Sequence, residues 1–447
     1  MLRRHFIWAV SVGLATVLHV NSVLAADTPR DLNWPQWRGP LANGVAPHGN
    51  PPIEWSESKN VQWKVALPGR GSSTPIIWEK QVFILTAIPT GKKVAVKPDA
   101  VPPGPNAHMV DPPREVQRFT VMALDRATGK VCWQQTAREQ VPHEGYHRDH
   151  GHASGSPITD GKYLVAYFGS NGLFCYDLTG HLLWQKDLGR QRTRYGYGEA
   201  TSPALSGHTV VIQWDHEDGD FIVALDVRDG KELWRQKRDE PTTWATPLVI
   251  EHEGRKQVVT NGTNKARSYD LATGELLWEC GGQTLNAIPS PVAGLGLVFV
   301  TSGYRGNALY AIRPGGRGDI AGTSSVVWKR RKHTPYVPSP LLYDDLLFVT
   351  VWNNAVLSII DAATGNTSVE VQRLEGLRDL YASAVGAAGR VYMIDREGGA
   401  VVLRKTNKVE VLARNHLDDG FDASPAVAGN QLFLRGKQFL YCLSESR

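Results

Sequence analysis

The strongest concentration of residues that could do chemistry is the segment HEGYHRDHGHASGSP, residues 143–157. Imidazole and carboxylate groups at short spacing are ligands for zinc and other transition metals. The spacing H-x-x-H-x-H is not a standard one, and a loop of this polarity is also typical of solvated surface. We therefore carry two interpretations, a solvated loop and a metal site. The candidate metal ligands are His147, Asp149, His150 and His152.

A second polar run, Trp214 to Asp220, contains four acidic residues that loosely resemble a calcium loop. Calcium loops close on a bidentate Glu, which is missing here, so this motif is weak. The chain has no G-x-S-x-G, which argues against the hydrolases that use this motif. It has no C-x-x-C, and its four cysteines lie far apart in apolar strand patterns. We expect buried thiols, with one unassigned disulfide as the alternative.

Two short signals alternate along the chain and indicate the elements that position these residues. One is a small residue before Pro; the other is an Asp, a turn with Gly and then Trp, as in ALDRATGKVCW (123–133) and YDLATGELLW (269–278). The signals recur roughly every 45 residues, a period typical of β-propellers. The small-Pro copies begin at Thr74, Ser156, Ser202, Thr246, Ser290, Ser339 and Ser424, with a degenerate eighth copy at Ser383.

Each repeat has the pattern of four antiparallel strands, A to D. Pro is tolerated where strand A begins, and the Asp-x-x-Thr-Gly stretch turns the chain between strands C and D. The Trp that ends strand D is best explained as a wedge between neighbouring blades. The sequence therefore predicts an all-β, eight-bladed propeller over residues 61–447, after an N-terminal extension over 26–60.

The two ends of this region predict how the ring closes. The final segment, FLYCLSESR, has the pattern of a strand C without a strand D after it. The strand around Trp63 has the pattern of a strand D and stands at the usual distance before the next small-Pro signal. We expect it to complete the last blade, which removes the exposed sheet edges.

In a propeller the D-to-A and B-to-C loops open on one face around the central channel. The residues just before each small-Pro signal should line this funnel, either as a ligand site or only as filling of the channel mouth. They are Arg70, His152, Tyr197, Glu199, Trp244, Asn286, Tyr336, Tyr381 and Asp422. A Pro-rich insertion in blade 1, residues 89–113, should lie on the same face as a lid, a partner-binding arm or a disordered loop.

The N-terminus predicts export. Arg3 and Arg4, an apolar stretch and the sequence Val23-Leu24-Ala25 form the pattern of a signal peptide over residues 1–25. The apolar stretch is too short to span a membrane, so we expect no transmembrane segment in the mature chain, which should be periplasmic or extracellular. The net charge of +5 is modest and no long basic run occurs, which argues against a nucleic-acid partner.

The repeated A-x-D-x-x-T-G-x-x-x-W motif resembles that of the pyrroloquinoline quinone (PQQ) repeat propellers, and the opening NWPQWRGPLANGV resembles an exported branch of them. The resemblance covers nearly all of the mature chain. It implies two kinds of function. Quinone-dependent alcohol and glucose dehydrogenases bind PQQ with calcium, often under a disulfide between adjacent cysteines, whereas the propeller lipoprotein of the outer-membrane β-barrel assembly machine binds no quinone.

The sequence favours a non-catalytic role over the dehydrogenase. No two cysteines are adjacent, and no residue matches a catalytic motif by spacing. We expect an exported binding or scaffold protein that uses the loop face for an unidentified protein or small-molecule partner, with no cofactor. A PQQ-dependent dehydrogenase with calcium is the alternative, with Trp244 as the stacking surface and Glu199 or Asp422 as a ligand.

Overall fold

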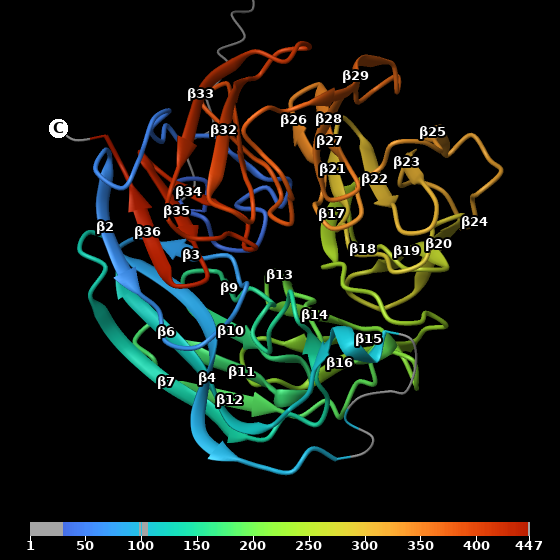
Figure 1. Cartoon of the computed structure of the whole chain (residues 1–447). Helices are drawn as coiled ribbons and strands as arrows, with labels where there is room; N and C mark the ends of the chain where they lie inside the picture. The colour runs from blue at the N-terminus through green and yellow to red at the C-terminus, as the bar shows by residue number, and fades with distance from the viewer. Residues whose placement is uncertain (1–29, 98–99, 101–105, 446–447) are drawn as a thin grey trace, which may run out of the picture.

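Eight small antiparallel sheets surround a central axis in the computed structural model of the chain (Figure 1). The structure describes residues 30–97, 100 and 106–445. The expected signal peptide, residues 1–25, lies outside the described residues, as do some prolines of the insertion in blade 1. The predicted all-β, eight-bladed propeller is confirmed. Among the described residues, no helix has the length and apolar character needed to cross a membrane.

The first four blades run in chain order. Blade 1 contains β3 (Ile76–Trp78), β4 (Gln81–Lys93), β6 (Glu115–Asp125) and β7 (Val131–Gln140). Blade 2 contains β9 (Ile158–Thr159), β10 (Tyr163–Tyr167), β11 (Leu173–Asp177) and β12 (Leu182–Lys186). Blade 3 contains β13 (Ala204–Ser206), β14 (Thr209–Trp214), β15 (Phe221–Asp226) and β16 (Glu232–Lys237). Blade 4 contains β17 (Leu248–His252), β18 (Arg255–Thr260), β19 (Lys265–Asp270) and β20 (Leu276–Gly281).

The other four blades complete the ring. Blade 5 contains β21 (Val292–Gly294), β22 (Leu297–Ser302), β23 (Ala308–Ile312) and β25 (Val326–Arg330). Blade 6 contains β26 (Leu341–Tyr343), β27 (Leu346–Val351), β28 (Asn354–Asp361) and β29 (Thr367–Arg373). Blade 7 contains β30 (Val385–Ala387), β31 (Arg390–Ile394), β32 (Gly399–Arg404) and β33 (Val411–His416). Blade 8 contains β34 (Ala426–Ala428), β35 (Gln431–Arg435), β36 (Phe439–Leu443) and β2 (Val61–Ala66).

Blade 8 joins the two ends of the described chain. Strand β2 pairs antiparallel with β36, so that Trp63 lies opposite Cys442. Two further strands extend blades in parallel: β1 (Val45–Ala46) pairs with β30 and β24 (Gly318–Asp319) pairs with β20. The elements outside the blades are β5 (Val110–Asp111), β8 (Tyr146–His147) and the 3-10 turns η1 (Ala107–Met109), η2 (Gly169–Asn171) and η3 (Arg194–Gly196).

A ring of hydrogen bonds around the axis explains why a small hydroxyl residue recurs at the start of every blade. In seven steps the backbone N–H of one such residue donates to the side-chain hydroxyl of its counterpart in the next blade, at 2.7–3.1 Å. The eighth step differs, because the Thr74 hydroxyl donates to the Ser424 carbonyl at 3.2 Å. Ser383 takes part although Ala384 replaces the usual proline, so the hydroxyl is the essential member of this signal.

The strand-D tryptophans lock each blade to the next, as the sequence predicted. Each of five indoles packs on the glycine of the next blade's turn and donates its Nε1–H to a carbonyl of that turn, at 2.7–3.0 Å. These tryptophans are Trp63, Trp133, Trp184, Trp234 and Trp328. Trp278 differs: it is fully buried, but its indole N–H has no partner, and blade 5 lacks the Asp-x-x-Thr-Gly turn that would supply one.

The wedge can be tested by two glycine substitutions with matched backbone strain. Gly274 (φ +75°) and Gly254 (φ +74°) both lie in the left-handed region, but a Cβ at Gly274 would lie 2.7 Å from the Trp234 ring, whereas a Cβ at Gly254 would meet nothing within 4 Å. We expect Gly254→Ala to cost about 1 kcal/mol of unfolding free energy and Gly274→Ala about 1–3 kcal/mol more in urea unfolding. Equal losses would contradict the wedge.

Candidate functional site

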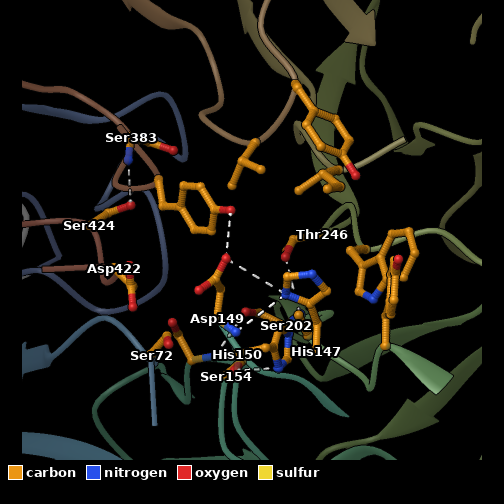
Figure 2. A pocket seen from close by; sticks show the side chains of 18 of the residues that line it. Ser72, His147, Asp149, His150, Ser154, Ser202, Thr246, Ser383, Asp422 and Ser424 are labelled. Atoms are coloured by element: carbon orange, nitrogen blue, oxygen red, sulfur yellow. Dashed lines mark hydrogen bonds and ion pairs between the residues drawn. The ribbon is translucent and has the colours of Figure 1, made fainter. Parts of the chain in front are cut away.

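A cavity of about 390 Å³ opens on the loop face around the axis (Figure 2). Its lining comes from D-to-A loops, from B-to-C loops and from the insertion in blade 1. Of the predicted channel-mouth and metal residues, eight line it: His147, Asp149, His150, Tyr197, Trp244, Tyr336, Tyr381 and Asp422. The sequence therefore indicated eight of the 22 described residues that line the cavity.

One side of the cavity is aromatic. The rings of Tyr304 and Tyr336 stack with centroids 5.0 Å apart, and Tyr197 and Trp244 line the cavity with them. The Trp244 indole N–H donates to the Gly198 carbonyl at 2.7 Å, which satisfies its polar edge. A wall of this kind offers ring faces to a bound group.

The opposite side carries two carboxylates that share one guanidinium. Arg396 lies 3.1 Å from Asp149 Oδ1 and 2.6 Å from Asp422 Oδ1, and its guanidinium lies 4.0 Å from the centre of the Tyr381 ring. The Tyr381 hydroxyl donates to Asp149 Oδ2 at 3.3 Å. Burial opposes ionisation of Asp149, but the bonds to Arg396 outweigh it and hold the pKa of this carboxyl below its ordinary value.

The histidine segment, residues 143–157, contributes His147 and His150 to the lining of the cavity beside Asp149, without forming a metal site. His147 Nδ1 accepts the backbone N–H of Asp149 at 3.3 Å, and His150 Nδ1 contacts the Gly151 carbonyl at 2.7 Å. His152 turns away, with its ring 4.5 Å from that of Tyr146. Within the described ranges no group of three or more His, Cys, Asp or Glu could hold a metal ion. His147, Asp149 and His150 all line the cavity but His152 does not, so the geometry gives the predicted four-ligand metal site no support.

The three partly buried histidines His147, His150 and His152 are neutral near pH 7. Burial lowers the pKa of His147, lowers that of His150 to about 4 and lowers that of His152 to about 3. The Nε2 atom of His150 is buried and has no hydrogen-bond partner. This segment therefore adds polar groups to the cavity but no positive charge.

Four predicted channel-mouth residues are not among those lining the cavity: Arg70, His152, Glu199 and Asn286. Arg70 is exposed and contacts the Tyr146 hydroxyl at 3.4 Å, and Asn286 is buried. Glu199 lies behind the wall, where its carboxylate accepts the Ser170 N–H at 2.5 Å. Burial raises the pKa of Glu199 to about 8, although the hydrogen bonds from Ser170 oppose the shift. A position just before a small-Pro signal therefore does not by itself place a side chain in the cavity, since side chains in one loop alternate between the cavity and the protein interior.

The sequence interpretation missed Tyr304, Arg396 and Met109. Tyr304 and Arg396 lie in B-to-C loops, of blades 5 and 7, which open on the same face as the D-to-A loops. Met109 belongs to the insertion, where β5 pairs with β8 and so brings η1 over the funnel. A search of every loop on this face, rather than of the D-to-A loops alone, would have found the first two.

The floor of the cavity is built from the hydroxyl ring and from Trp37. Five ring residues line the cavity: Ser156, Ser202, Thr246, Ser383 and Ser424. Trp37 lies in the N-terminal segment, which Arg38 anchors by donating to the carbonyls of Ala384 and Pro340 at 2.7 and 2.8 Å. A second cavity of about 330 Å³ also contacts Trp37, together with the first strands of blades 3 and 4. The indole therefore stands between the two cavities.

The other chemical candidates serve the fold. The carboxylate of Asp215 is fully buried and pairs with Arg238 at 2.6 Å, and Asp220 accepts the backbone N–H of Glu240 at 2.6 Å. These carboxylates are not arranged as a calcium loop. All four cysteines are free; three are buried as expected, but Cys132 is exposed, because it occupies the outer strand of blade 1.

Comparison with known proteins identifies relatives of the fold. The family model described as outer membrane protein assembly factor BamB matches residues 117–371, more than half of the chain. No curated protein matches the chain. The solved structure of BamB from Moraxella catarrhalis is 16% identical, with a TM-score of 0.56, and the match covers 80% of this chain and 99% of that one.

Quinohemoprotein alcohol dehydrogenases are similar in structure as well. The enzyme from Comamonas testosteroni is 10% identical, with a TM-score of 0.61, and the match covers 94% of this chain and 82% of that one. The enzyme ADHIIG from Pseudomonas putida HK5 is 12% identical, with a TM-score of 0.60 and the same coverage. At such identities these likenesses show the fold alone, and function has to be argued from the site.

Glu199→Gln should change how stability depends on pH. The carboxyl has a pKa of about 8 in the folded protein, but about 4.3 in an unfolded chain. Between about pH 4 and about pH 8, folding therefore takes up a proton at this carboxyl. Its contribution to stability is complete below about pH 4 and is lost as the pH rises through 8. We expect the wild type to lose more stability than the variant from about pH 5 to about pH 8, by at most about 1.4 kcal/mol per pH unit in urea unfolding.

The matched control is Glu375→Gln, which removes a carboxyl from an exposed position. Its stability should follow that of the wild type across the same pH range. Parallel curves for the wild type and Glu199→Gln would contradict the raised pKa.

Proposed function

This chain belongs to the BamB-type family of PQQ-like β-propellers, and we propose that it is an exported, non-catalytic binding protein whose loop-face cavity holds a small ligand. The family contributes the scaffold but does not decide between binding and catalysis. The observation that carries the proposal is the cavity itself. It combines a volume of about 390 Å³ with ring faces on one side and hydrogen-bonding groups on the other, the usual make-up of a ligand site.

The cavity does not fit the quinone of the alternative function. Pyrroloquinoline quinone carries three carboxylates, so a site for it needs cationic side chains. Among the described residues that line the cavity there is no Lys or Arg, and two are the acidic Asp149 and Asp422. Calcium takes six to eight oxygen ligands, and in the described part of the chain no group of three or more His, Cys, Asp or Glu could hold a metal ion. We therefore assign no step to either group.

Two of the polar groups that line the cavity are already engaged by hydrogen bonds within the protein. The Asp149 carboxylate is engaged by Arg396 and Tyr381, and His147 Nδ1 already accepts a backbone N–H. A general base needs a free lone pair within reach of the substrate. Asp149 and His147 already accept hydrogen bonds, which weakens them as bases and supports binding over turnover, whereas Asp422 keeps its Oδ2 free and is the carboxylate to test as a base. Export is proposed on the basic and apolar pattern of residues 1–25.

Purified protein should neither retain pyrroloquinoline quinone nor reduce a redox dye with alcohols or sugars. The quinone with calcium should leave the midpoint of thermal unfolding unchanged, because only a compound that binds the folded state raises it. The same assay applied to a library of uncharged and charged metabolites should find compounds that do raise it. Dye reduction that depends on the quinone and disappears in Asp422→Asn would overturn the proposal in favour of the dehydrogenase.

A further inference from the structure

We infer that the ligand of this cavity is an organic cation, whose ammonium or guanidinium group lies between the Asp422 carboxylate and the tyrosine rings. This inference rests on the proposed function and names the chemical class of its ligand. It follows from the charge of the wall, from the ring faces and from the hydroxyl floor, taken in turn.

The interior of the cavity carries a net negative charge. Asp149 and Asp422 line it, whereas the one guanidinium that pairs with both of them, Arg396, stands behind them. One Arg cannot neutralise two carboxylates, so one negative charge is left over. Asp422 uses Oδ1 for Arg396, and its Oδ2 has no hydrogen-bond partner among the described residues. A cation in the cavity would pair with this free oxygen, and an anion would meet it unscreened.

The ring faces around the cavity are suited to the same kind of group. A cation over an aromatic face is attracted by the ring quadrupole, most strongly where both are desolvated. The wall itself shows this arrangement, because Arg396 stacks on Tyr381 at 4.0 Å between the two carboxylates. Tyr304 and Tyr336 offer further ring surface across the cavity.

The floor indicates that the ligand also carries hydrogen-bond acceptors. The five ring hydroxyls that line the cavity each accept a backbone N–H, but in the described part of the chain none of them donates a hydrogen bond. Four of the five are buried. Their O–H groups are therefore free to donate to an oxygen of the ligand. Amino alcohols, betaines and amino acids combine such an oxygen with a cationic group.

The rim of the cavity makes an anion the competing hypothesis. Arg194 lies over the Tyr195 ring and Arg305 over the Tyr304 ring, at 5.5 and 5.4 Å, and neither has an ion-pair partner among the described residues. They would attract an anion to the mouth. The carboxylates that line the interior, rather than the arginines at the rim, decide which charge the bound group carries. Electrostatic interactions are strongest where water is excluded, and the carboxylates, unlike the arginines, line the cavity.

Calorimetric titration of the full chain with three probes of similar size tests the inference. The probes are choline, its uncharged isostere 3,3-dimethylbutan-1-ol, and the anion succinate. We expect choline to bind at least about tenfold more tightly than the isostere, the difference that a desolvated cation–ring contact and a carboxylate supply. Succinate should not bind. Equal binding of choline and the isostere, or binding of succinate alone, overturns the inference but leaves the proposed binding function intact.

Two variants locate the site. Asp422→Asn removes the free negative charge and keeps an oxygen for Arg396, so it should weaken choline binding about tenfold while the isostere binds as before. The matched control is Asp379→Asn, which removes a carboxylate from an exposed loop position that does not line the cavity. Equal loss in both variants would show a general charge effect and overturn the site.

Two further measurements answer separate questions. The first tests the inference if Asp422→Asn does not fold, and the second asks whether the cation is a free metabolite or a side chain of a protein. If Asp422→Asn does not fold, Tyr336→Leu removes a ring face and should lower the preference for choline over the isostere; an unchanged preference overturns the inference. Titration with a lysine tripeptide distinguishes a free metabolite from a peptide side chain. Binding of choline without the tripeptide assigns a free metabolite, and binding of both choline and the tripeptide assigns a protein partner with a cationic side chain.

Discussion

The ring of hydroxyl groups around the axis is the constraint on which the rest of the structure depends. Each blade begins where its backbone N–H finds the hydroxyl of the next blade, and the chain of these bonds runs from Thr74 to Ser424. A buried N–H without a partner is costly, so every blade must present such a residue at the same radius. This requirement sets the start of strand A eight times and makes the inner wall of the channel polar.

The outer part of the ring obeys a second, complementary rule. Where the hydroxyls join blades at the axis, the tryptophans join them farther out, each indole packing on the glycine of the next blade's turn. The glycine is required because any Cβ would occupy the space of the ring. Blade 5 lacks the turn, and Trp278 loses its hydrogen-bond partner as a consequence. Its ring stays buried all the same, so packing continues where the hydrogen bond is lost.

The cavity is a product of this architecture rather than of any one motif. Eight strands that start at the axis leave a channel, the N-terminal segment places Trp37 beneath it, and loops from different blades enclose the space above. The scaffold is common to BamB and to quinohemoprotein dehydrogenases, so its presence says nothing about chemistry. The loops decide it, and here they bring together tyrosines, two carboxylates and neutral histidines.

The sequence by itself determined the repeat and the number of blades, and it indicated the loop face on which the cavity opens. It could do so because these depend on local rules: a hydroxyl before Pro, an Asp-x-x-Thr-Gly turn and a Trp at the end of a strand. It also indicated Tyr197, Trp244, Tyr336, Tyr381 and Asp422, which line the cavity.

Only the tertiary structure decided which side chains of each loop enter the cavity and which face the interior. Glu199 and Ala200 are neighbours, yet Ala200 lines the cavity while the Glu199 carboxylate turns back to Ser170. The pairing of Arg396 with Asp149 and Asp422 joins residues from three loops far apart in the chain. Such contacts depend on how the closed ring brings distant loops to one axis, and no spacing within a single repeat contains that information.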